Sequence, residues 1–178
     1  IEFLTGQRQA PRLKKVVLAL CSELLILAEL ASDDQHATTM LNEALESGKA
    51  AEIFSQMTSL LGGPSDLVEN YDKHLAKAPI IRPLLHQGIG YVSHIDTRAL
   101  GLSVLTLGGG RTHADDAIDS AVGLENVISI GDSSEQPLAM IHAHDESSWQ
   151  EAADRIHQAI SFQEAKEPDL PIIYEVIR

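Results

Sequence analysis

The sequence predicts an α+β protein in which a run of helices precedes a mixed region of strands and helices. Apolar residues recur at helical spacing through the first third of the chain, a pattern typical of amphipathic helices. After Pro79, short β-branched runs alternate with two further helical patterns. Helices followed by mixed strands favour an α+β arrangement. The turn-rich stretch between Pro64 and Pro79 indicates the boundary between the two regions.

Three helices are expected before this boundary. Pro11 suits a first helical turn, and residues 12–31 are apolar on nearly every side, which indicates a buried helix. Ser32 is expected to cap a second helix that ends near Gly48, because Gln35 completes a capping box with this serine. The third helix has an apolar face made of Ala50, Ile53, Phe54, Met57, Leu60 and Leu61.

Five strands and two helices are expected after the boundary. A helix over residues 96–107 has Asp96 as its N-cap and Gly108 as its end. A last helix begins at Asp145 and buries one face. The residues of this face are Trp149, Ala152, Ala153, Ile156 and Ile160. Strands are predicted at residues 80–85 and 89–95 around a turn at Gly88, and at 127–130, 138–142 and 172–177.

The charge of the chain restricts its partners. Its 178 residues carry a formal net charge of −13 at pH 7, and such a surface repels nucleic-acid phosphates and anionic lipids. Neither nucleic acid nor membrane is therefore expected as a partner. The longest apolar run, residues 16–30, contains a serine and two glutamates and is shorter than the roughly 20 apolar residues of a membrane span. The single cysteine, Cys21, allows no internal disulfide, which favours a reducing cytoplasm.

A glycine run followed by an arginine is the first candidate binding element. The run Gly108–Gly110 would let the backbone approach a phosphate, and Arg111 would add positive charge. However, the run follows a helix, whereas phosphate sites use the free N–H groups at a helix start. Its spacing matches neither the Walker nor the dinucleotide motif. A helix-ending turn is the favoured interpretation, with Arg111 bonded to helix carbonyls or paired with Asp119. Phosphate binding is the alternative.

Two groups of histidine and aspartate have residue types that suit a metal ion. The first contains His113, Asp115, Asp116 and Asp119, and the second contains His142, His144 and Asp145. Positions 142 and 144 of a strand point to the same side, so two imidazoles could hold zinc if a third ligand joined them. Neither group has the spacing of a known metal motif. We interpret the aspartates as caps of helices and turns and expect no metal site.

The segment from Gly131 to Ile141 resembles the tight turn and following strand of biotinyl and lipoyl carrier domains. Those domains carry a modified lysine in a hairpin, and no lysine lies near this segment. The resemblance therefore indicates a shared strand shape. A stand-alone small binding module without catalysis remains an alternative for the whole chain.

Several motifs in a fixed order resemble one enzyme family. The central motifs are Asp96-Thr97-Arg98-Ala99-Leu100-Gly101, Leu107-Gly108-Gly109-Gly110-Arg111 and Ile118-Asp119-Ser120-Ala121-Val122-Gly123. They resemble the C-terminal domain of bacterial thymidine phosphorylases, and the wider pyrimidine nucleoside phosphorylase family shares looser forms. Further similar segments run from Phe3-Leu4-Thr5-Gly6 to Trp149-Gln150-Glu151-Ala152-Ala153, so the resemblance covers essentially the whole chain.

The resemblance implies a parent enzyme that cleaves thymidine with phosphate, giving thymine and 2-deoxyribose 1-phosphate in pyrimidine nucleoside salvage. It implies a cytoplasmic glycosyltransferase that needs no cofactor and pairs as a homodimer through an N-terminal helical domain. It assigns residues 1–78 to the last helices of the α/β phosphorylase domain. Residues 79–178 are assigned to the family's C-terminal domain, which has an α/β-hammerhead arrangement.

The residues that perform the family's chemistry do not occur in this sequence. Its phosphate motif, Lys-His-Ser-Thr-Gly-Gly, is absent, and the base-binding arginine, serine and lysine precede every segment that is similar here. No catalytic residue is therefore assigned, and the chain by itself is expected to be inactive. Because the sequence begins at Ile1, we expect a fragment or a processed product. The motif residues expected to be structural are Asp96, Arg98, Gly108, Gly109, Gly110, Arg111 and Asp119.

Overall fold

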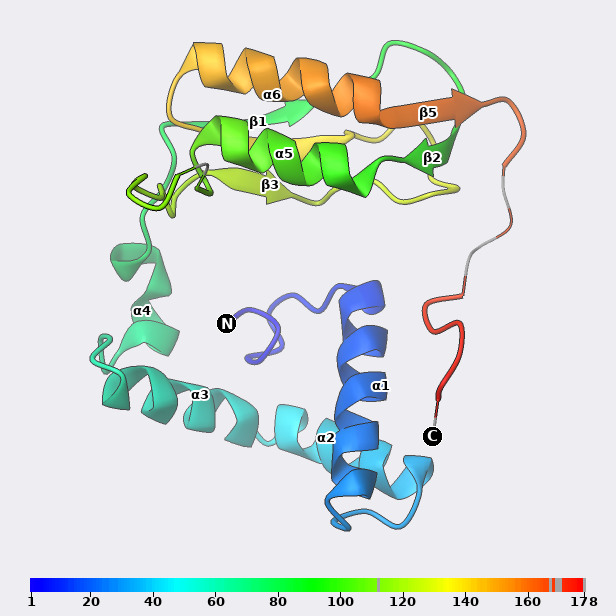
Figure 1. The fold of residues 1–178 in the computed structure, drawn as a ribbon. Helices are drawn as coiled ribbons and strands as arrows, with labels where there is room; N and C mark the ends of the chain where they lie inside the picture. Colours follow the sequence, from blue (N-terminus) through cyan, green and yellow to red (C-terminus); the bar gives the residue numbers. More distant parts are fainter. Residues whose placement is uncertain (112, 167, 169–170, 178) are drawn as a thin grey trace. The chain divides into compact units, whose positions relative to one another are not determined.

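The computed structural model of the chain describes residues 1–111, 113–166, 168 and 171–177. The chain divides into two compact units, Ile1–His74 with Pro171–Arg178, and Leu75–Leu170. Among the described residues, the regular elements of the first unit are helices, and those of the second unit are helices and two small antiparallel sheets (Figure 1). The expected α+β class is confirmed. No helix among the described residues is both long and apolar enough to cross a membrane.

Four helices make up the first unit, and each contacts the next along the chain. They are α1 (Pro11–Leu27), α2 (Asp34–Glu46), α3 (Lys49–Leu60) and α4 (Leu67–His74). Pro11 stands in the first turn of α1, as the sequence predicts. Gly48 separates α2 from α3 with a φ of 76°, a left-handed conformation that glycine adopts without strain. The expected stop between these helices is therefore confirmed.

Three expectations for this unit are wrong. The N-cap of α2 is Asp33 and not Ser32, because the Asp33 carboxylate accepts a hydrogen bond of 2.8 Å from the His36 N–H. The stretch expected to be a linker contains α4, whose acidic first turn and basic last turn complement the helix dipole. Helix α1 is not buried: it packs against α2, but a second set of its leucines is left uncovered by the described residues. Those more than half exposed are Leu20, Leu24 and Leu27.

The described residues of the second unit form five short strands and two helices. In chain order they are β1 (Ile80–Leu84), β2 (Tyr91–Ile95), α5 (Thr97–Leu107), β3 (Gly123–Glu125), β4 (Ala139–Ala143), α6 (Glu146–Ala159) and β5 (Ile160–Gln163). Strand β4 pairs with β1 on one side and with β3 on the other, and β2 pairs with β5. All these pairs are antiparallel. Helices α5 and α6 pack on each other, and α6 also contacts β1 and β4 (Figure 1).

The core of the second unit lies between the helix pair and the sheets. In β4, Ala139, Ile141 and Ala143 are buried and the alternate residues are not, so one face of the three-stranded sheet is covered. Leu138 and Ile156 are completely buried in the same cluster. The buried face expected for the last helix is confirmed, except that Ile160 already belongs to β5.

The strand pairing differs from the expectation in three places. Strands β1 and β2 do not form a hairpin around Gly88, because β1 pairs with β4 and β2 with β5. The strand expected at residues 127–130 is replaced by β3, and Asn126 with its φ of 51° ends that ladder. The described residues 171–177 contain no strand. These differences share one cause: pairing is decided by distant segments, which local composition does not specify.

Helix α6 begins at an aspartate cap whose carboxyl has a lowered pKa. The Asp145 carboxylate accepts a 2.8 Å hydrogen bond from the Ser148 N–H, and this bond lowers the pKa of Asp145 below its ordinary value of 3.8. A carboxyl with a lowered pKa stabilises the folded state above its unfolded pKa. That contribution is lost as the pH falls through the folded value.

We therefore expect the Asp145→Asn variant to lose less stability than the parent chain as the pH falls from about 5 to about 2. Asparagine still caps the helix but does not titrate. Denaturant unfolding at a series of pH values measures the difference between the two proteins. Superimposable pH profiles would show that the cap carboxylate is not linked to folding.

Candidate functional site

Six of the seven motif residues lie in helix α5, at its N-cap or in the turn that follows it. The seventh, Asp119, contacts this turn. At its N-terminus, the Asp96 carboxylate accepts a 3.0 Å hydrogen bond from the Ala99 N–H. The Asp96 N–H donates to the Ala159 carbonyl at 2.8 Å, which joins the start of α5 to the end of α6. Arg98, in the first turn, is exposed. Asp96 is therefore the N-cap that the sequence predicts.

The C-terminus of α5 closes in a Schellman turn. Gly108 has a φ of 93°, and its N–H donates to the Leu105 carbonyl at 2.9 Å. The Gly109 N–H donates to the Val104 carbonyl at 3.0 Å. These two bonds satisfy carbonyls that the end of a helix otherwise leaves without partners. The helix end expected at Gly108 is confirmed, and the groups gathered there are carbonyls rather than free N–H donors.

The second glycine of the run allows a close contact between the turn and its neighbours. A Cβ at Gly109 would lie 2.9 Å from Val104 Cγ1, 3.3 Å from the Val104 carbonyl oxygen and 3.4 Å from Val122 Cγ2. The 2.9 Å approach to Val104 Cγ1 is closer than real Cβ atoms come to other carbons, so an alanine here would force the turn and the Val104 side chain apart. The close approach therefore serves packing against the chain itself.

Asp119 closes the turn from the other side. Its N–H donates to the Gly108 carbonyl at 2.9 Å, and its carboxylate accepts from the Ala121 N–H at 2.9 Å. The carboxylate also lies 3.7 Å from Nδ1 of His144. The sequence leaves Arg111 two partners, helix carbonyls or Asp119, and in the structure the Asp119 carboxylate contacts a histidine. Arg111 is exposed.

In the structure, the histidines of the two groups lie in separate pairs, each with a carboxylate. His113 lies 3.6 Å from Asp116 through Nδ1, and Nε2 of His142 lies 3.2 Å from Oε2 of Glu125 on the neighbouring strand β3. Asp145 caps α6 as described above. Within the described ranges, no three histidine, cysteine or carboxylate side chains form a group that could hold a metal ion. The pair between His142 and Glu125 joins two strands and was not visible in the sequence, because it depends on their register.

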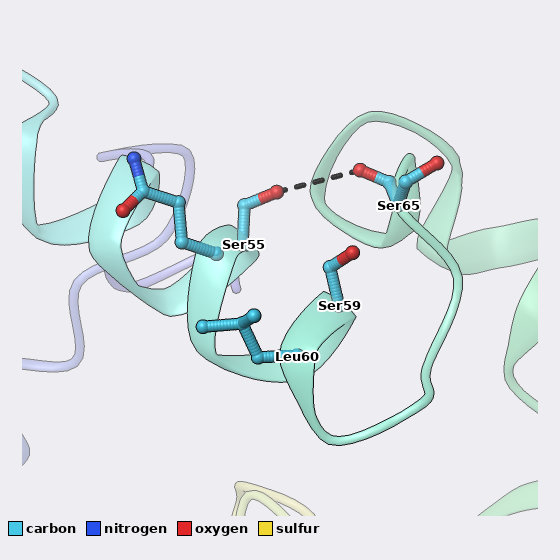
Figure 2. Close-up of a pocket in the computed structure, with 5 residues that line it drawn as sticks. Ser55, Ser59, Leu60 and Ser65 are labelled. Atoms are coloured by element: carbon cyan, nitrogen blue, oxygen red, sulfur yellow. Dashed lines mark hydrogen bonds between the residues drawn. The ribbon is translucent and has the colours of Figure 1, made fainter.

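The helical unit also contains a pocket that the sequence does not predict. It has a volume of about 440 Å³ at the end of α3 and the turn that follows (Figure 2). The lining residues are Ser55, Gln56, Ser59, Leu60 and Ser65. The Ser55 hydroxyl donates to the Ser65 carbonyl at 3.5 Å. The lining contains no histidine, carboxylate or cation, so none of its hydroxyls has a neighbouring base to activate it. In the sequence, the one pattern that could have indicated this pocket is the spacing of Ser55 and Ser59, which places both on one helix face.

Comparison with known families finds a match within the second unit. Residues 91–163 match the family model described as the pyrimidine nucleoside phosphorylase C-terminal domain. The match runs from the start of β2 to the end of β5 and includes every motif residue of α5 and its turn. The resemblance inferred from the motifs is confirmed over this range. Residues 91–163 are therefore similar to the C-terminal domain of the pyrimidine nucleoside phosphorylase family.

Proposed function

We propose that the chain is the C-terminal part of a thymidine phosphorylase and that its own role is to support the catalytic part. The match to the family's C-terminal domain carries this proposal, together with the order of motifs that resembles thymidine phosphorylases. The reaction would be the phosphorolysis of thymidine to thymine and 2-deoxyribose 1-phosphate. The parent would be a cytoplasmic homodimer that needs no cofactor.

The geometry of the motif turn supports a structural role. Its carbonyls are closed by backbone N–H groups of the turn and of Asp119. Its central glycine fits against Val104 and Val122 of the same unit. A phosphate ligand would need N–H donors aimed outward, as at a helix start, whereas this turn follows the end of α5. The motif thus orders the junction between α5 and β3.

The exposed faces of the helical unit support a second part of the proposal. We assign residues 1–78 to the last helices of the α/β phosphorylase domain and residues 79–178 to the C-terminal domain. On α1, Leu20, Leu24 and Leu27 recur at helical spacing and are 60%, 64% and 78% exposed. At about 25 cal/mol per Å², leaving such side chains in water forgoes several kcal/mol of stabilisation. An outer helix layer that has a sheet to cover would recover this free energy.

The chain alone is expected to release no thymine from thymidine and phosphate. A longer product of the same gene that contains the Lys-His-Ser-Thr-Gly-Gly motif is expected to release it at rates typical of enzymes, about 1–1,000 per second. Both proteins should be assayed with thymidine, deoxyuridine and uridine, which also separates a strict thymidine enzyme from a broader pyrimidine one.

Two outcomes would contradict the proposal. Turnover by the 178-residue chain that persists through further purification would place a catalytic site within it. A gene product that starts at residue 1 and has no phosphorolysis activity would favour a stand-alone binding module.

A further inference from the structure

The three-stranded sheet of the second unit has two edges, which are formed by β3 and β1. Strand β3 is only 3 residues long, and Asn126 with its left-handed backbone ends the pairing of this strand with β4. Strand β1 is longer, Ile80–Leu84, and pairs with β4 on one side only. An edge strand presents backbone N–H and C=O groups to any further strand that approaches it.

The backbone groups of β1 alternate between its paired side and its free edge. The Leu84 carbonyl accepts a 2.7 Å hydrogen bond from the N–H of Leu138, which directly precedes β4, so the polar groups of Leu84 point toward β4. Because neighbouring residues of a strand direct these groups to opposite sides, those of Ile81 and Pro83 point to the free edge. Proline has no N–H. Ile81 is therefore the one residue of β1 that directs a donor outward.

The solvent-facing side of this edge is apolar. The side chains of Ile81, Pro83 and Leu85 follow one another at strand spacing along β1 and the residue after it. Ile81 is 47% exposed, Leu85 is 58% exposed, and Pro83 is exposed as well. Arg82, which lies between them, faces α6 instead, with its guanidinium 3.8 Å from the centre of the Trp149 ring. A strand that combines a free edge with exposed apolar side chains is a surface at which protein chains add to one another.

We propose that Pro83 closes the free edge of β1 to strand addition by a second copy of this chain. A second copy carries the same edge, and two β1 strands related by a twofold axis run antiparallel. In the alignment centred on this strand, Ile81 of each copy lies opposite Pro83 of the other. Residues opposite each other at such positions exchange two main-chain hydrogen bonds, and each proline removes one of them. The pairing then loses half of its hydrogen bonds. This inference is independent of the proposed function.

Self-association of the full chain, measured by sedimentation equilibrium, tests the proposal. Pro83→Val supplies the missing N–H, keeps the position apolar and favours a strand. We expect its dissociation constant for self-association to be at least about tenfold lower than that of the parent chain, because the pairing regains its lost hydrogen bonds. Adding Ile81→Lys to Pro83→Val should restore the parent value, since a charge on an edge strand opposes pairing. The matched control Pro64→Val lies in the turn after α3 and should change nothing.

Hydrogen exchange of the N–H that Pro83→Val introduces gives a second readout. This N–H should exchange as fast as in an unstructured peptide when the protein is dilute, and more slowly as the protein concentration rises. Protection that does not depend on concentration would show that the N–H points toward β4, and would overturn the proposal. A dissociation constant within about twofold of the parent value would overturn it too. Loss of the native circular dichroism in Pro83→Val would mean that the fold itself needs the proline, which also contradicts the proposal.

Discussion

Replacing Ile156 with alanine is expected to lower the free energy of unfolding by about 3 kcal/mol. Ile156 lies on the inner face of α6, is 0% exposed and belongs to the core cluster that joins the two helices to the sheets. Alanine leaves a cavity in this cluster, and the surrounding groups relax only in part. Urea unfolding of the full chain, followed by far-ultraviolet circular dichroism, measures the change.

The matched control for Ile156 lies two residues further along the same helix. Gln158 is exposed, so Gln158→Ala should change the free energy of unfolding by no more than about 0.5 kcal/mol. Equal losses in both variants would mean that the inner face of α6 is not the core of this unit.

Two glycine-to-alanine changes around α5 are expected to act in opposite directions. At Gly109 the added Cβ meets Val104 and Val122, so Gly109→Ala should destabilise the chain by about 2 kcal/mol. Gly101 lies exposed within α5, and its added Cβ would meet nothing within 4 Å. Gly101→Ala should therefore stabilise the chain by about 1 kcal/mol. Both values follow from the midpoints of denaturant unfolding.

The informative result is the difference in stability between the Gly109→Ala and Gly101→Ala variants. If Gly109→Ala were as stable as the parent chain, the close contact of the turn with Val122 would be unnecessary. The run of glycines would then need another explanation. If Gly101→Ala were strongly destabilised, Gly101 could not lie at an exposed position of α5.

Local signals in the sequence located the ends of the helices, because caps act over three or four residues. Asp96, Gly108 and Asp145 were each predicted from their neighbours and each has the expected geometry. The one misplaced cap, Ser32 in place of Asp33, lies a single residue away. An aspartate next to a helix start combines a hydrogen-bond acceptor with a charge that suits the dipole, which favours Asp33 over the neutral Ser32.

Pairing across the chain was not predictable from one sequence. The antiparallel alignment of Ile80 with Ala143 joins segments that are more than 60 residues apart, and nothing near either strand specifies the partner. The tertiary contacts of the candidate site are not predictable from one sequence either. Gly108 was assigned a helix-ending role from its position, whereas the contact of Gly109 with Val122 and the pair of Asp119 with His144 depend on tertiary structure.

The central claim is that the matched domain supports a phosphorylase without contacting its substrates. Arg111 is the cation of the motif that a phosphate ligand would use, so Arg111→Ala in the longer enzyme tests this claim most directly. Two quantities should be measured on the same protein, the melting temperature and the Michaelis constant for phosphate. The account predicts a Michaelis constant within about twofold of the parent enzyme. A rise of tenfold or more, about 1.4 kcal/mol of lost binding, at an unchanged melting temperature would contradict it.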